Sequence, residues 1–288
     1  ECSDGSLSIA GNVSKKDKQH DVSKITIDIE PYLEDIDQIL LAVYYMGASE
    51  ITLLTKKPIH DNTLFLIRKT VNHMSGTEIV YEDKEKIQIK IMLDISNVNL
   101  KQLVSRMILI LKSMLANLSK APSEISLKEI KLFEQESDRL YHLISKILVN
   151  STHNTSLLSS SGVGDCMYIP SYNLVAKKLE NIADNFDDIA ELSISTRKNF
   201  ENKKEIFQFI EEVIERCNRK ILKSLASKRG VFRKTHTADR EKIKQSISKI
   251  KDISLRISIS EIIRFLDDIE CEFVNLSFYK NMKDDKLI

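Results

Sequence analysis

The feature that most constrains the fold is the part of the chain after Asn97, where strand patterns stop and helical periodicity begins. Six segments there repeat apolar residues at the three- and four-residue spacing of amphipathic helices. They cover residues 100–121, 126–149, 172–196, 203–227, 237–253 and 257–282. Only 7 Gly and 4 Pro among 288 residues leave few places for tight turns. We therefore expect a mainly α protein.

Three helices can each bury one apolar stripe around a shared axis, so we expect the six helices to form two tandem three-helix bundles. The first bundle would cover residues 98–197 and the second residues 200–284. The connection "NSTHNTSLLSSSGVGDC" at 150–166 is long and rich in Ser and Gly. We expect it to be a disordered or mobile loop.

The segment before these helices has a different pattern, which predicts a small α/β domain at 24–95. "ITIDI", "SEITLLT", "TEIVYED" and "KIQIKIML" read as four strands, because apolar and β-branched residues dominate or alternate in them. Helical spacing at 35–46 and 60–74 separates the first three strands, which gives a βαβ-αββ order. Residues 1–23 are expected to be a polar linker that follows one remnant strand, "DGSLSI".

Composition argues against several functional classes. The 43 Lys and Arg residues nearly balance the 42 Asp and Glu residues, so the charge does not demand a nucleic-acid or membrane-surface partner. No apolar run approaches the roughly 18 residues of a membrane-spanning helix. The four cysteines are scattered without a CxxC pair, which predicts reduced thiols. We expect a cytoplasmic protein without membrane insertion.

The motifs of common enzymes are also missing from the sequence. There is no GxGxxG, GxxxxGK[ST], HExxH or GxSxG pattern, and the six histidines never pair at four-residue spacing. We therefore expect a binding protein, not an enzyme.

Two acidic pairs are the most informative residues. In "FEQESDRLYHLISKIL", Glu134 and Asp138 lie one helical turn apart beside an apolar stripe, and Asp184 and Asp188 repeat this spacing. If the two helices are antiparallel neighbours, four oxygen donors could converge on a cation such as iron, zinc, manganese or magnesium. Spacing alone favours an ordinary solvated acidic face, since charged residues usually lie outside helices.

Two stretches carry a family resemblance. "ESDRLYHLISKIL" at 136–148 and "LENIADNFDDIAE" at 179–191 resemble the two signature helices of PhoU-like phosphate uptake regulators, and the resemblance spans about residues 98–282. The N-terminal part is similar to a variant in which an AbrB-like DNA-binding module precedes an α/β spacer. Only the last strand of that module would be present here, so nucleic acid would be bound only through a missing N-terminal module.

The resemblance implies two three-helix bundles with metal clusters held by E(D)xxxD motifs. Glu134 with Asp138 and Asp184 with Asp188 match that motif, although Asn181 replaces the usual Arg before "IAD". The second bundle departs further, because Cys271 follows Asp267 at the position of the second acid. Asp267 is therefore expected to be a remnant of a second site.

The resemblance further implies a regulator that restrains phosphate uptake by coupling a phosphate transporter to its signalling partner. We expect such a protein to act by protein–protein binding and to form a homo-oligomer. Two alternatives remain at this point. The chain could be the sensor and oligomerisation part of a transcriptional regulator whose DNA-binding module lies upstream, or a helical adaptor without a metal.

Overall fold

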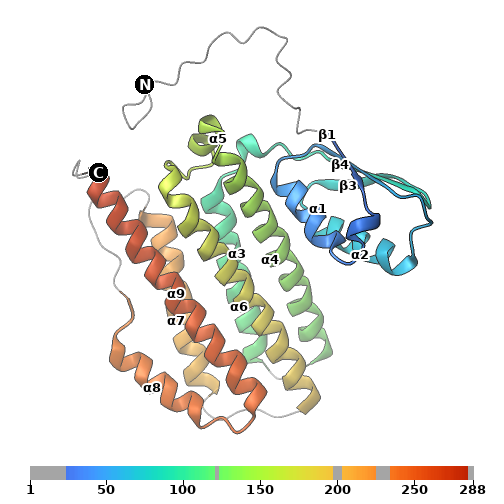
Figure 1. Cartoon of the computed structure of the whole chain (residues 1–288). Coiled ribbons are helices and arrows are strands. Elements are labelled where there is room, and N and C mark those ends of the chain that lie inside the picture. The colour runs from blue at the N-terminus through green and yellow to red at the C-terminus, as the bar shows by residue number, and fades with distance from the viewer. Residues whose placement is uncertain (1–23, 121–122, 197–202, 225–233, 285–288) are drawn as a thin grey trace.

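The computed structural model describes residues 24–120, 123–196, 203–224 and 234–284 (Figure 1). This part of the chain is mainly helical, with nine α-helices and a small four-stranded mixed sheet near the N-terminus. The α/β region and the helical region expected from the sequence are therefore both present. The predicted remnant strand and linker at 1–23 lie outside the described residues.

The N-terminal region alternates strands and helices as the sequence predicts. Its elements are β1 (Lys24–Asp28), α1 (Ile36–Tyr45), β2 (Glu50–Leu54), α2 (Asp61–His73), β3 (Thr77–Glu82) and β4 (Lys86–Ile91). The sheet order is β1-β2-β4-β3, with β1 parallel to β2 and the other pairs antiparallel. Ile87, Ile89 and Ile91 alternate with more exposed residues, so β4 turns one apolar face toward the core that the sheet shares with α1 and α2.

The helical region begins at α3 and continues to α9. The helices are α3 (Leu100–Ser119), α4 (Glu124–Ser151), α5 (Thr155–Ser160), α6 (Ile169–Thr196), α7 (Lys203–Ser224), α8 (Thr237–Ser248) and α9 (Ile253–Asp284). Side-chain caps fix two of the starts. Asn99 accepts hydrogen bonds from the Lys101 and Gln102 amides before α3, and Ser123 accepts one from Ser126 before α4.

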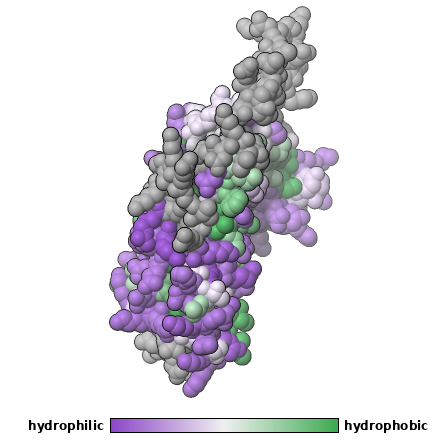
Figure 2. All heavy atoms as spheres, turned by 90° about the vertical axis from the view of Figure 1, so that its left-hand side faces the viewer, coloured by the Kyte–Doolittle hydropathy of each residue, from purple (hydrophilic) through white to green (hydrophobic). Residues whose placement is uncertain are grey.

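One continuous apolar core holds the long helices together. It contains fully buried side chains from α3, α4, α6, α7 and α9, including Ile108, Ile144, Phe186, Ile210 and Ile262. Helix α6 packs against both α4 and α9 and so lies at the centre of this region (Figure 1). Viewed from the side of α8 and α9, the outer surface is mainly hydrophilic (Figure 2).

The connection between α4 and α6 differs from its prediction. We expected a disordered or mobile loop at 150–166, but the structure forms the short helix α5 there and a 3-10 turn at Cys166–Tyr168. Two apolar residues explain the order, because Leu157 and Val163 are buried. The Asn154 side chain also caps α5 by accepting a hydrogen bond from the Leu157 amide.

The α/β domain lies against α4 through α1 and α2 (Figure 1). Its apolar core is separate from the core of the helical region. A polar contact connects the two: Asn150 Nδ2 on α4 donates to the Tyr45 carbonyl at 2.8 Å. The same amide donates to the Lys146 carbonyl of its own helix at 2.7 Å. Gly47 follows α1 with a φ of +92°, and a Cβ atom there would clash with the Asn150 amide. The close approach therefore requires glycine.

The Gly47→Ala substitution tests this contact. We expect it to lower the free energy of unfolding by about 1–2 kcal/mol for the left-handed backbone and by about 1 kcal/mol more for the displaced Asn150 hydrogen bond. Urea unfolding of the full chain would measure the change. Gly164→Ala is the matched control, because Gly164 has a φ of +82° but open space around its Cβ position. Equal losses for the two variants would contradict the role of the Asn150 contact.

Candidate metal centre

A polar stripe on α4 builds one side of the candidate site. Glu134, Asp138, His142, Lys146 and Asn150 follow one another at four-residue spacing, so neighbouring members lie one turn apart in a row that winds gradually around the helix. The adjoining face is apolar, with Ile130 and Ile144 buried in the helical core. Packing of the apolar face thus fixes the direction of the polar stripe.

Helix α6 supplies the other side of the site, and its apolar packing also orients the polar residues. Ile182, Ala183 and Phe186 are fully buried and fix α6 against its neighbours. Asp184 lies between them in sequence and points toward α4. One oxygen from each of Glu134, Asp138 and Asp184 falls within 4.8 Å of the others. Three of the four predicted ligands therefore converge.

The fourth predicted ligand is placed differently. Asp188 is exposed and stands outside the group of three carboxylates. Asp187 was not predicted as a ligand, but it acts on the site electrostatically, because its charge helps to raise the pKa of Glu134. One Asp187 oxygen is buried and has no hydrogen-bond partner among the described residues.

Burial and acidic neighbours raise the pKa of two of the three carboxylates. Burial, followed by the charges of Asp138 and Asp187, raises the pKa of Glu134 to about 7. Burial, followed by the charges of Glu180 and Asp138, raises the pKa of Asp184 to about 8. Without a cation, the site therefore favours protonated carboxyl groups. A bound cation would favour the ionised form of the same groups.

Two histidines that the sequence analysis did not assign lie beside the carboxylates. His73, the last residue of α2, places its Nδ1 atom 3.1 Å from Asp138 Oδ2. The His142 ring lies 6.2 Å from the His73 ring, and its Nδ1 is 2.5 Å from the Tyr45 hydroxyl. Burial lowers the pKa of His142 to about 4, so this imidazole is neutral at pH 7.

The nearby Lys177 offsets the charge of the three carboxylates only in part. Lys177 Nζ lies 2.7 Å and 2.6 Å from the two oxygens of Glu180, and it sits 4.9 Å above the centre of the Tyr141 ring. The Tyr141 ring therefore offers its face to the lysine ammonium group. Glu180 forms the direct contacts with the lysine, and the charge of Lys177 offsets only part of the effects that raise the pKa of Asp184.

Asp267 has a different environment from the first acidic group. Arg240 contacts both Asp267 and Glu270, and Arg216 Nη2 lies 2.8 Å from Glu270 Oε1. Glu270 is fully buried, so these guanidinium groups supply the charge that it needs. At the expected remnant site, arginine side chains therefore take the position that a cation would otherwise occupy.

The donor set of the first acidic group fits a metal ion. Carboxylate oxygens bind magnesium, manganese, iron and zinc, and the perturbed pKa values reflect a charge that such an ion would balance. No protein family, curated protein or solved structure is significantly similar to this chain. Among the described residues, none of the helices has the length and apolar content that a bilayer span requires.

The charge of the group predicts a stability effect for Asp184→Asn. In chelator-treated protein we expect the variant to be more stable than the wild type by about 1 kcal/mol or more at pH 8.5, since one pKa unit corresponds to about 1.4 kcal/mol and water screens part of the effect. Wild-type stability should fall as the pH rises toward 8, because the folded carboxyl groups bind protons more tightly than the unfolded ones.

The gain from Asp184→Asn should accordingly be smaller at pH 5.5 than at pH 8.5. Denaturant unfolding at both pH values would measure it. Asp188→Asn is the matched control, because this residue lies on the same helix but is exposed. A gain that is equal for the two variants, or that does not change with pH, would contradict the repulsion between Asp184 and its acidic neighbours.

Proposed function

We propose that the chain is a PhoU-like regulator of phosphate uptake and homeostasis that acts by binding other proteins and holds a metal ion at its carboxylate group. The observation that supports this proposal is the meeting of Glu134 and Asp138 with Asp184 on two adjacent helices. These helices are the two whose sequences resemble the family's signature helices. The two helices that resemble the family in sequence are thus the same two helices whose carboxylates come together.

The proposed arrangement of the helices follows the same resemblance. In it, α3, α4 and α6 form the first three-helix bundle and α7, α8 and α9 the second, with the two bundles sharing one apolar core. The metal site belongs to the first bundle. In the second bundle, the arginine network around Glu270 serves in place of a metal.

The chain's own residues define how the site would work. Glu134, Asp138 and Asp184 would hold the ion, and iron, zinc, manganese or magnesium would supply the positive charge that lets all three ionise together. The long helices would present their outer faces to a phosphate transporter or to its signalling partner. We place the protein in the cytoplasm as a homo-oligomer, with nucleic acid bound only if the native chain carries an upstream module.

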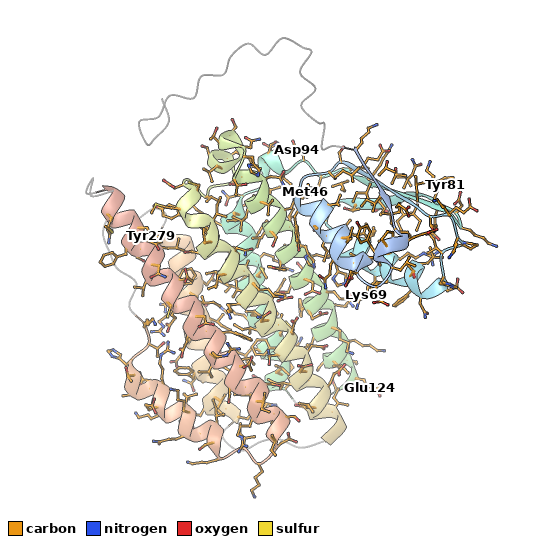
Figure 3. All side chains as sticks on the ribbon, in the orientation of Figure 1. Met46, Lys69, Tyr81, Asp94, Glu124 and Tyr279 are labelled. Atoms are coloured by element: carbon orange, nitrogen blue, oxygen red, sulfur yellow. The ribbon has the colours of Figure 1, made fainter. Side chains whose placement is uncertain are left out.

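The metal site is tested by the Glu134→Ala, Asp138→Ala double variant. We expect it to lose bound metal, because two of the three oxygen donors are removed. Elemental analysis of protein purified alongside the wild type would measure metal per chain. The control is Glu124→Ala with Glu129→Ala, which removes two exposed carboxylates from the first turns of α4 (Glu124 is labelled in Figure 3). Equal metal content in both variants would refute the assignment.

The regulatory role is tested by affinity capture of the full chain from cells grown at high and at low phosphate. We expect a phosphate transporter subunit or its signalling partner to be recovered, in amounts that change with phosphate. The double variant at Glu134 and Asp138 should alter this recovery if the ion helps to shape the binding surface. Recovery of neither type of protein under either condition would contradict the proposed function and leave the helical adaptor as the better description.

A further inference from the structure

The α/β domain is attached to the helical domain by an interface that is polar at its centre. Each domain keeps an apolar core of its own. Where they meet, α4 packs against α1 and α2 (Figure 3). Domains that meet through polar contacts move relative to each other more readily than domains with a shared apolar core.

One of these polar contacts reaches the candidate metal centre. His73 ends α2, and its Nδ1 lies 3.1 Å from Asp138 Oδ2, with both side chains mostly buried at 21% and 16% exposure. A carboxylate has two oxygens, so Asp138 can accept a hydrogen bond from His73 and still present an oxygen to Glu134 and Asp184. The imidazole thereby restricts the orientation of one metal-binding carboxylate.

Neighbouring contacts hold the end of α2 in this place. Ser75, two residues after His73, donates from its hydroxyl to the Arg139 carbonyl on α4 at 3.4 Å. The Tyr44 hydroxyl on α1 donates to the Ser75 carbonyl at 3.1 Å. Tyr45 contacts His142 one turn further along α4. The position of His73 therefore depends on docking of the whole α/β domain and not on a single side chain.

We propose that His73 is a positioning residue for the metal centre, so that metal binding and docking of the α/β domain stabilise each other. This inference rests on the proposed metal site and adds its regulation. A bound ion would hold one Asp138 oxygen in a fixed position, which places the other oxygen to accept from His73. Coupling of this kind is reciprocal: whatever factor docking adds to metal affinity, the metal adds to docking.

Mn²⁺ titration calorimetry on the full chain tests the first half of the proposal. His73→Ala should weaken Mn²⁺ binding about 10- to 100-fold, the usual range for loss of a group that orients a metal ligand. His73→Asn should recover most of the affinity, because its amide nitrogen can donate from a similar position. His60→Ala is the matched control, since His60 precedes the same helix but is exposed.

Hydrogen–deuterium exchange tests the second half. Mn²⁺ should slow exchange in α1 and α2 of the wild type and of His60→Ala, but not of His73→Ala. Mn²⁺ affinity and protection that are unchanged in His73→Ala, while the Glu134 and Asp138 double variant loses binding, would overturn this inference and leave the metal site standing. A wild-type chain that binds none of Mn²⁺, Mg²⁺, Zn²⁺ and Fe²⁺ would overturn both.

Discussion

The structure depends on apolar packing that forces like charges together. Ile144 on α4 and Phe186 on α6 are completely buried in one core, and burial of side chains this large contributes on the order of 2 kcal/mol each. Two like charges a few ångströms apart near a protein surface repel by a comparable or larger amount. The core therefore sets the distance between the helices, and the carboxylates must adapt to it. They do so by protonation or by binding a cation.

The two acidic groups of the helical region differ in how their charge is balanced. Around Glu270, the chain supplies its own cations, and Arg216 and Arg240 approach a carboxylate that has no access to water. These arginine side chains are part of the chain, so the charge that balances Glu270 cannot leave for solvent as a bound ion could. Around Asp184, the nearby Lys177 is engaged by Glu180 instead. An ion from solution can enter there, and its entry would depend on conditions in the cell.

Much of this arrangement could be predicted from the sequence, because helical periodicity and the four-residue spacing of acids depend only on local geometry. The order of the elements and the pairing of Glu134 with Asp138 followed from that geometry. The convergence of Asp184 required the further assumption that two helices are neighbours. Asp188 showed the limit of the method: spacing puts it on the same side as Asp184, but one more helical turn carries it out to solvent.

The remaining features could not be found by local reasoning. His73 is separated from Asp138 by 65 residues and by a change of domain, and nothing in its sequence neighbourhood marks it as part of a site. The order of α5 depends on two apolar residues, Leu157 and Val163, within a segment whose polar composition is typical of a loop. His142 did carry a signal, because it continues the spacing of Glu134 and Asp138.

The four-residue spacing on α4 continues beyond the metal centre and has a structural cause. A helix packed only against one apolar core needs one buried stripe, and its other positions can vary freely. Helix α4 has a second constrained row of side chains, from Asp138 to Asn150, because residues of the α/β domain contact it. Polar residues serve there since each can be satisfied by a partner across the interface, as Asn150 is by the Tyr45 carbonyl. A row of this kind holds two domains in register and still allows them to separate, since its polar groups can exchange their partners for water. Placing the carboxylates at one end of the row gives an ion access to the same interface.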